Sequence, residues 1–125
     1  MKISILTCTL NSENRIRILA DSLVNQIDKN FKWVIKDAFS TDNTLKIIEN
    51  YKNYLDIQII QEKDSGIYDG MNQAIKKLNT NYYLVMGDND FLYSDTIRCL
   101  NQIIINNKVD LVSMYWQVKK KIYKP

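Results

Sequence analysis

The sequence predicts an α/β fold in which a mostly parallel sheet carries helices on both faces. Short apolar segments alternate with amphipathic segments along the whole 125-residue chain. The connections between these segments are short, and such an alternation gives parallel strands joined by right-handed crossovers. No Pro- or Gly-rich linker interrupts the pattern, and Pro125 is the only proline. We therefore expect a single domain over residues 1–118, followed by a basic tail over residues 119–125.

Five apolar segments are predicted as strands because they are short, rich in β-branched and aromatic residues, and end at polar residues or glycine. They span residues 3–7, 31–36, 57–61, 82–86 and 109–118. The fourth segment is apolar at successive positions, which is typical of a strand buried on both faces. In the fifth segment the apolar side chains that share one face are Val112, Met114, Trp116 and Val118.

Four segments between these strands have apolar residues at helical spacing. We expect Asn11 or Ser12 to cap the first helix, Ser40 to open the second, and Ser94 to cap the fourth, while the third spans about residues 68–78. The four apolar faces are Ile16, Leu19, Ala20, Leu23, Val24 and Ile27; Leu45, Ile48 and Tyr51; Ile67, Met71, Ala74, Ile75 and Leu78; and Ile97, Leu100 and Ile104.

The composition excludes several classes of chemistry. The chain has no histidine, which excludes Ser-His-Asp and Cys-His mechanisms and His-ligated zinc, so carboxylates are the natural metal ligands. Cys8 and Cys99 lack CxxC spacing and are expected to be reduced, buried small residues. The net charge of +3 suits a small anionic ligand but is too small for a nucleic-acid interface.

We expect a cytoplasmic protein, because no apolar segment has the length of a membrane span and the N-terminus lacks the apolar region of a signal peptide. Lysines cluster in the basic tail. This cluster has two open interpretations, a solvated tail or a weak patch that contacts the inner membrane surface. Its members are Lys119, Lys120, Lys121 and Lys124.

Polar stretches follow four of the predicted strands directly. They cover residues 9–11, 37–42, 62–66 and 88–90. In a parallel sheet these four loops share one edge, which is the geometry of a nucleotide or phosphate site. Asp88 and Asp90 suit a hard divalent cation that bridges to substrate phosphates, and Lys63 could pair with charge nearby.

Each of these residues also has a structural interpretation. Asp88 and Asp90 could cap the turn and helix that follow them, and Asp37 could be a turn acid instead of a hydrogen-bond acceptor for a base or ribose. Asp69 and Asn72 lie near the start of a predicted helix. There they could contact substrate, or complement the helix dipole and form a surface amide.

Three blocks of the sequence resemble family 2 glycosyltransferases with the A-type nucleotide-sugar fold. ISILTCTLN resembles the family's opening strand followed by Thr-x-Asn, and WVIKDAFSTDNT resembles its Asp-Gly-x-Ser-Thr-Asp-x-Thr block. QEKDSGIYDGMNQAIKKLNTNYYLVMGDND resembles the run that leads into the metal-binding acids. The resemblance covers about residues 1–92 and is greatest to the branch that builds bacterial surface polysaccharides.

The resemblance implies a Rossmann-like fold and an enzyme that transfers a sugar from a nucleoside-diphosphate donor to a hydroxyl of a glycan or lipid-linked acceptor, with Mn²⁺ or Mg²⁺. Carried over by position, three sets of residues would form the site. They are Thr9, Asn11, Asp37, Lys63 and Asp64 for the nucleotide, Asp69, Asn72 and Asp88 for the donor sugar, and Asp90 with Asp88 for the metal.

The sequence departs from the family pattern at several positions. Ala38 and Asn43 replace glycines and Leu10 replaces a frequent tyrosine, while Asn89 replaces a frequent aspartate and weakens the acidic cluster. In the family the general base lies beyond the last strand seen here, so we expect it beyond Pro125 and expect the fold to be truncated on its C-terminal side.

Two other functional classes share features with this sequence. A nucleotide-sugar-binding domain without catalytic activity, completed by a missing segment or a partner chain, is the alternative to an enzyme. A phospho-accepting receiver domain has similar alternation but needs acids after its first strand, and the turn Cys8-Thr9-Leu10-Asn11 contains none. An exposed edge beside residues 109–118 would favour a homo-oligomer.

Overall fold

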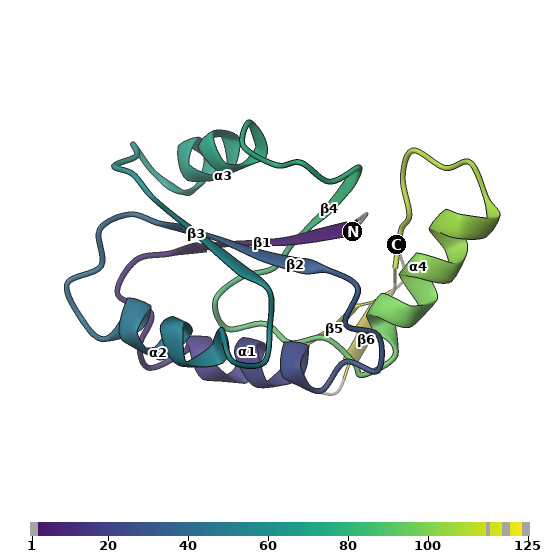
Figure 1. The fold of residues 1–125 in the computed structure, drawn as a ribbon, viewed down its shortest axis with the longest axis horizontal. Helices are drawn as coiled ribbons and strands as arrows, with labels where there is room; N and C mark the ends of the chain where they lie inside the picture. The colour runs from purple at the N-terminus through teal and green to yellow at the C-terminus, as the bar shows by residue number, and fades with distance from the viewer. Residues whose placement is uncertain (1–2, 115, 119–120, 124–125) are drawn as a thin grey trace.

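The computed structural model describes residues 3–114, 116–118 and 121–123, and its main sheet has four parallel strands. The strands are β1 (Ile3–Thr9), β2 (Lys32–Asp37), β3 (Ile57–Gln61) and β4 (Tyr82–Val85), in the order β3-β2-β1-β4 (Figure 1). The chain adds β2 and β3 on one side of β1 and then crosses to add β4 on the other. A topological switch point therefore lies between β1 and β4, where α/β proteins commonly bind ligands.

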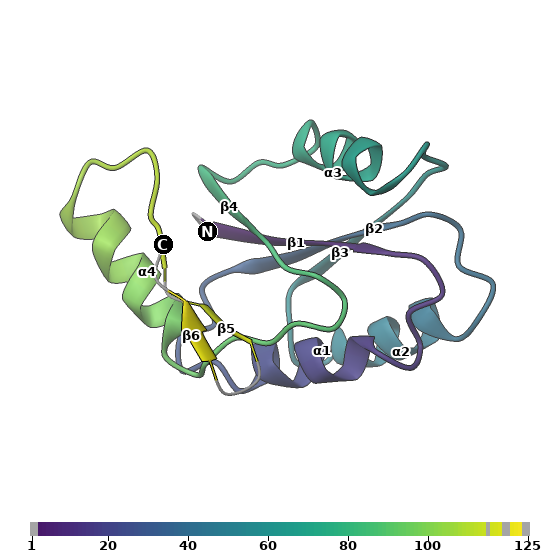
Figure 2. The same ribbon diagram turned by 180° about the vertical axis from the view of Figure 1, so that it is seen from behind.

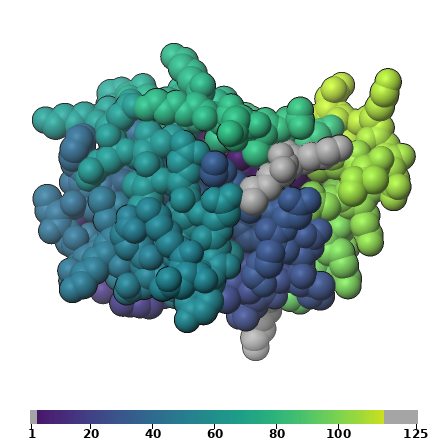
Figure 3. Space-filling model, in the orientation of Figure 1, coloured from purple at the N-terminus to yellow at the C-terminus, as the bar shows by residue number. Residues whose placement is uncertain are grey.

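Helices cover both faces of this sheet, as predicted. α1 (Ile16–Val24) and α2 (Thr44–Tyr51) lie on one face, and α3 (Ile67–Ile75) lies on the other (Figure 1). α4 (Thr96–Asn106) stands beyond the end of the sheet where β1 begins (Figure 2). The space between α3 and the sheet is filled by side chains (Figure 3). None of the helices in the described residues is a candidate membrane span.

Two apolar clusters hold the layers together. The larger lies on the side of α1 and α2, where Ile5, Trp33 and Ile35 from the strands are fully buried. The smaller lies beneath α3 and contains Leu6, Val34, Ile60 and Ala74. Successive residues of β1 and β2 thus enter opposite clusters, as the period of two in a strand requires. The predicted faces of the four helices supply most of the remaining apolar contacts.

A buried glutamine fixes the start of α4. Gln26 is 2% exposed, and its Nε2 donates to the carbonyl oxygen of Tyr93 at 2.7 Å. Its Oε1 accepts the backbone N–H of Ile97 at 3.1 Å, which satisfies one of the free donors in the first turn of the helix. α4 begins at Thr96 and Asp95 is its flanking residue, so the cap predicted at Ser94 was placed one residue too early.

The predicted starts of the first two helices are also early. α2 begins at Thr44 because Ser40 donates both its backbone N–H and its hydroxyl to the carboxylate of Asp37. α1 begins at Ile16, and the hydroxyl of Ser12 bonds to Asp88 instead of capping the helix. Both serine hydroxyls thus donate to aspartates of the strand-end loops, and helix periodicity does not reveal these contacts.

The two last predicted strands require correction. Tyr83 is 51% exposed and Val85 is 44% exposed, so β4 is not buried on both faces; it is an edge strand of the described sheet, and α3 packs against β1 and β2. Residues 109–114 form no strand. β5 (Trp116–Val118) instead pairs antiparallel with β6 (Lys121–Tyr123) in a separate two-stranded sheet.

Some finer predictions also differ or are left open. Ile27 and Ile67 are each 60% exposed, because they lie beyond the end of α1 and at the first position of α3. Both cysteines are free, but Cys99 is exposed and Cys8 only partly buried. β6 falls inside the predicted basic tail, and Lys119, Lys120 and Lys124 lie outside the described residues. The domain boundary at residue 118 stays a prediction.

Candidate functional site

The loops after β1 and β2 are joined by Asn11 at the carboxyl edge of the sheet. Its Oδ1 accepts the backbone N–H of Thr41 at 2.8 Å, and its own backbone N–H donates to the Ser40 hydroxyl at 2.9 Å. Asn11 has φ 50, in the left-handed region that asparagine tolerates better than most residues. The structure therefore gives this predicted nucleotide-binding residue a position that links two of the four loops.

Asp37 lies at the end of β2 with its carboxylate enclosed by hydrogen-bond donors. The residue is 0% exposed, and Oδ1 accepts the hydroxyls of Thr9 at 2.7 Å and Ser40 at 2.6 Å. Oδ2 accepts the Ser40 backbone N–H at 2.9 Å and, more weakly, Gln61 Nε2 at 3.4 Å. The structure thus brings Thr9 and Asp37 together, as predicted. Contact between Asp37 and a nucleoside stays a prediction.

A buried ion pair that sequence reasoning missed fixes the loop after β3. Lys36 Nζ donates to Asp64 Oδ2 at 2.7 Å and to the Glu62 carbonyl oxygen at 2.6 Å, and the Lys36 side chain is 0% exposed. The hydrogen bond from Lys36 holds the pKa of Asp64 below its usual value, against the opposing effect of burial. The available signal was a lysine that follows the apolar run Trp33–Ile35 directly, inside the predicted strand.

Gly70 lets α3 approach this ion pair. A Cβ at this position would lie 2.7 Å from Asp64 Oδ2, closer than real Cβ contacts allow. The glycine lies between Asp69 and Met71 in the third sequence block. The close approach explains why a residue without a side chain is suited to this position.

The remaining predicted residues of this region lie around the start of α3. Asp69 Oδ2 accepts the backbone N–H of Ser65 at 2.9 Å, so this carboxylate closes the turn that enters the helix. Lys63 and Asn72 are exposed. The structure places Lys63, Asp64, Asp69 and Asn72 on the side of α3, and no hydrogen bond within the described residues joins them to Asp88 or Asp90.

The acidic residues after β4 lie across the switch point from the loop after β1. Asp88 Oδ2 accepts the Ser12 hydroxyl at 2.6 Å and Arg15 Nη2 at 2.9 Å. The hydrogen bond to Asp88 and the negative charge of its carboxylate raise the pKa of the Arg15 guanidinium. Asp90 is exposed, and its Oδ2 accepts the backbone N–H of Gly87 in the same loop at 2.8 Å.

The donor set of this loop fits a hard divalent cation that takes most of its ligands from substrate and water. Each carboxylate of Asp88 and Asp90 has an oxygen, Oδ1, that accepts no hydrogen bond within the described part of the chain. The described residues contain no group of three or more His, Cys, Asp or Glu side chains that could hold a metal ion alone. Asp88 and Asp90 therefore offer a cation two free carboxylate oxygens within the described residues.

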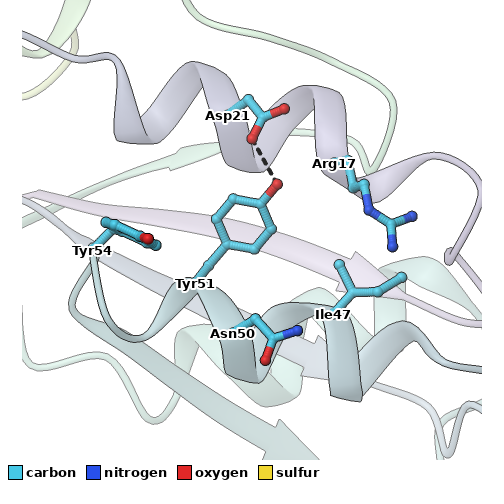
Figure 4. Close-up of a pocket in the computed structure, with 6 residues that line it drawn as sticks. All are labelled: Arg17, Asp21, Ile47, Asn50, Tyr51 and Tyr54. Atoms are coloured by element: carbon cyan, nitrogen blue, oxygen red, sulfur yellow. Dashed lines mark hydrogen bonds between the residues drawn. The ribbon is translucent and has the colours of Figure 1, made fainter.

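A separate hollow of about 360 Å³ lies on the outer surface of the helical layer, between α1 and α2 (Figure 4). The Tyr51 hydroxyl donates to Asp21 Oδ1 at 2.6 Å, and burial together with that carboxylate raises the pKa of Tyr51 to about 12. The lining residues are Arg17, Asp21, Ile47, Asn50, Tyr51 and Tyr54, none of which belongs to the strand-end loops. The hollow is distinct from the candidate site.

Comparison with known proteins identifies the family. The model of the family described as "Glycosyl transferase family 2" matches residues 4–122. The chain belongs to glycosyl transferase family 2. The resemblance of the three sequence blocks is thereby confirmed.

Two bacterial relatives of the chain are glycosyltransferases by their names. Poly(ribitol-phosphate) beta-N-acetylglucosaminyltransferase TarS of Staphylococcus aureus is 31% identical over 102 residues, covering 78% of this chain and 18% of TarS. A PGL/p-HBAD biosynthesis glycosyltransferase of Mycobacterium tuberculosis is 33% identical over 97 residues, covering 75% of this chain and 38% of that protein. The chain thus spans well under half the length of these relatives.

Two solved structures share the fold. S. aureus TarS 1–349 in complex with UDP-GlcNAc superposes with a TM-score of 0.79 at 31% identity, covering 85% of this chain and 32% of that one. Mannosyltransferase PcManGT from Pyrobaculum calidifontis, in complex with GDP-Man and Mn²⁺, has a TM-score of 0.70 at 17% identity, covering 77% and 30%. The second likeness is one of fold alone. Both confirm the predicted α/β architecture of the family.

Proposed function

We propose that this chain forms the donor-binding part of a glycosyltransferase that moves a sugar from a nucleoside diphosphate to an acceptor hydroxyl in surface-polysaccharide synthesis. One observation carries the proposal. The loops after β1, β2 and β4 converge at the switch point of a family 2 fold, and a relative of 31% identity has been solved with UDP-GlcNAc. UDP is accordingly the first nucleotide to test.

The predicted site residues divide into roles by their surroundings. We assign the nucleotide to the loops after β1, β2 and β3, where hydrogen bonds fix the polar groups in advance and reduce the ordering that binding requires. The residues held in this way are Thr9, Asn11, Asp37 and Asp64, and the exposed Lys63 is assigned to the nucleotide with them. Asp69, Asn72 and Asp88 are assigned to the donor sugar, with Asn72 offering an exposed amide.

Asp90 and Asp88 would hold a divalent cation through one carboxylate oxygen each. A cation bound there, Mn²⁺ or Mg²⁺, supplies charge that stabilises the diphosphate as it leaves the sugar. The protein's own contribution is to present the two carboxylates next to the donor-binding loops. A glycan or lipid-linked hydroxyl compound is the expected acceptor, and a general base from elsewhere in the protein would activate it.

A thermal-shift panel tests the proposal. UDP, GDP, CDP and dTDP are each added with and without Mn²⁺ to the wild-type chain, to Asp90→Ala and to Asp56→Ala. Asp56 is an exposed aspartate at the opposite edge of the sheet, directly before β3, and is the matched control. At 100 times its dissociation constant, a ligand stabilises the fold by about 2.7 kcal/mol.

We expect one nucleotide to raise the melting temperature further when Mn²⁺ is added, in the wild type and in Asp56→Ala but not in Asp90→Ala. No shift with any nucleotide on a folded chain would refute the donor-binding proposal. Release of UDP from UDP-GlcNAc then separates an enzyme from a binding domain. Metal-dependent release indicates catalysis by this chain, and binding without release favours the domain completed by another segment or partner.

A further inference from the structure

Arg15 bridges the two sides of the switch point. It lies at the start of α1, in the connection from β1, and its Nε and Nη2 donate to Asp88 Oδ2 at 3.1 and 2.9 Å. Nη2 also donates to the Asn11 carbonyl oxygen at 3.4 Å. With the Ser12 hydroxyl at 2.6 Å, Asp88 Oδ2 accepts hydrogen bonds from two side chains of the opposite loop.

This arrangement changes the charge that the acidic loop offers to a metal. Asp88 and Asp90 are its two carboxylates, and Asn89 between them is neutral. The guanidinium of Arg15 compensates one of the two negative charges and occupies the lone pairs of Asp88 Oδ2. A divalent cation would then find only Oδ1 of this carboxylate free and would experience repulsion from Arg15.

Arg15 can also leave Asp88 for another acceptor. The side chains of Arg15 and Asp88 are 45% and 24% exposed, and ion pairs with this much solvent contact are weak. A guanidinium matches the oxygens of a phosphate as well as those of a carboxylate, with parallel N–H donors. Arg15 therefore has a second acceptor available once a nucleoside diphosphate occupies the crevice.

We propose that Arg15 is a resident counter-cation of Asp88, which competes with a divalent metal for this carboxylate and turns to the diphosphate when the donor binds. The competition concerns the free protein, and the transfer to diphosphate rests on the proposed function. Arg15 is thus a positioning residue that makes tight metal binding depend on the nucleotide.

Direct titration of Mn²⁺ tests the competition without nucleotide. The free Mn²⁺ signal in electron paramagnetic resonance is followed for the full chain, for Arg15→Gln and for Arg17→Gln. Arg17 belongs to the same helix and is exposed, but it donates to the Glu13 carbonyl oxygen and not to Asp88. Both variants remove one positive charge and one hydrogen bond to a backbone carbonyl oxygen, but only Arg15→Gln removes the ion pair with Asp88.

We expect the dissociation constant for Mn²⁺ to fall about fivefold or more in Arg15→Gln, the gain that release of an ion pair allows, and to change less than twofold in Arg17→Gln. Asp88→Asn should abolish that gain in the double variant. Equal affinities in Arg15→Gln and Arg17→Gln, or absence of Mn²⁺ binding to any variant, would overturn the proposal. Urea unfolding of each variant confirms that it is folded.

Binding of UDP without metal tests the transfer. We expect Arg15→Gln to weaken it by about threefold or more and Arg17→Gln to leave it unchanged. If no nucleotide binds any variant while Arg15→Gln still binds Mn²⁺ more tightly, the competition stands, and the transfer fails together with the proposed function. If UDP binds all three proteins equally, the transfer alone is overturned.

Discussion

Two regions at the carboxyl edge of the sheet contrast in how their polar side chains are held. The tied loops, residues 9–14, 37–44 and 61–66, bond to one another, and Asp37 within them is 0% exposed with two oxygens that accept several donors. The acidic loop, residues 87–90, reaches the rest of the protein through Asp88, while Asp90 is exposed and bonds to Gly87 of its own loop. The aspartates that follow the parallel strands therefore differ in role: Asp37 connects neighbouring loops, whereas Asp90 bonds within its own loop.

The position of each strand explains part of this contrast. β1 and β2 are inner strands of the described sheet, so loops from both neighbours surround their ends. The loop after β3, which is itself an edge strand, is held by the buried Lys36–Asp64 pair. β4 is an edge strand of that sheet, and its loop has neighbours on one side. Substitutions in the tied loops should change the stability of the fold. Substitutions in the acidic loop should change ligand binding while the fold persists.

The largest expected effect on stability is that of Lys36→Met. Removal of the ammonium leaves Asp64 without its partner inside the protein, and breaking a buried pair in this way costs about 3 kcal/mol or more. The free energy of unfolding is measured with urea. Lys32→Met is the control, because Lys32 begins the same strand and has no ion pair within the described residues. A loss equal to that of the control would contradict the structural role of Lys36.

Asp37→Ala should cost about 2 kcal/mol, because it leaves the hydroxyls of Thr9 and Ser40 without their acceptor in a buried environment. Urea unfolding of this variant is compared with that of Asp56→Ala, which removes an exposed carboxylate at the opposite edge of the sheet. If the two variants lose the same free energy of unfolding, the hydrogen bonds to Asp37 do not stabilise the fold.

The pKa of Asp64 gives a smaller, pH-dependent effect. Because the hydrogen bond from Lys36 lowers this pKa in the folded state, the carboxylate stabilises the fold above its unfolded pKa near 3.8. This stabilisation should be lost as the pH falls below that value and through the folded pKa. The difference in unfolding free energy between wild type and Asp64→Asn, measured at pH 7, 5, 4 and 3, should therefore shrink toward acid pH. A constant difference would exclude this linkage.

The local sequence predicted the alternation of strands and helices because apolar spacing is a local property. β3 was predicted at its observed bounds, and the face of α4 with Ile97, Leu100 and Ile104 was correct. The fifth strand, predicted over residues 109–118, was wrong over residues 109–114, and its pairing was not predicted because alternation alone does not identify the partner; β5 pairs with β6. The exposure of β4 likewise depends on which strands follow it, which its own residues do not encode.

The site was predicted as a set of residues but not as a network. The motif blocks indicated Asp37 and Asp88, yet Ser12, Arg15 and Lys36 reach their partners across 76, 73 and 28 positions of sequence. Contacts at such separations follow from the strand order, which single residues do not reveal. The enclosure of Asp37 and the compensation of Asp88 by Arg15 therefore required the fold.

Among these substitutions, Asp90→Ala should change the free energy of unfolding least. Its carboxylate is exposed and accepts one backbone N–H within its own loop, so water can replace it, and the unfolding free energy should change by less than about 0.5 kcal/mol. The same substitution should abolish the metal-dependent nucleotide shift. A loss of stability as large as that of Asp37→Ala would place Asp90 in the structural network as well. The two regions would then not differ, because the same carboxylate chemistry would hold the fold on both sides of β1.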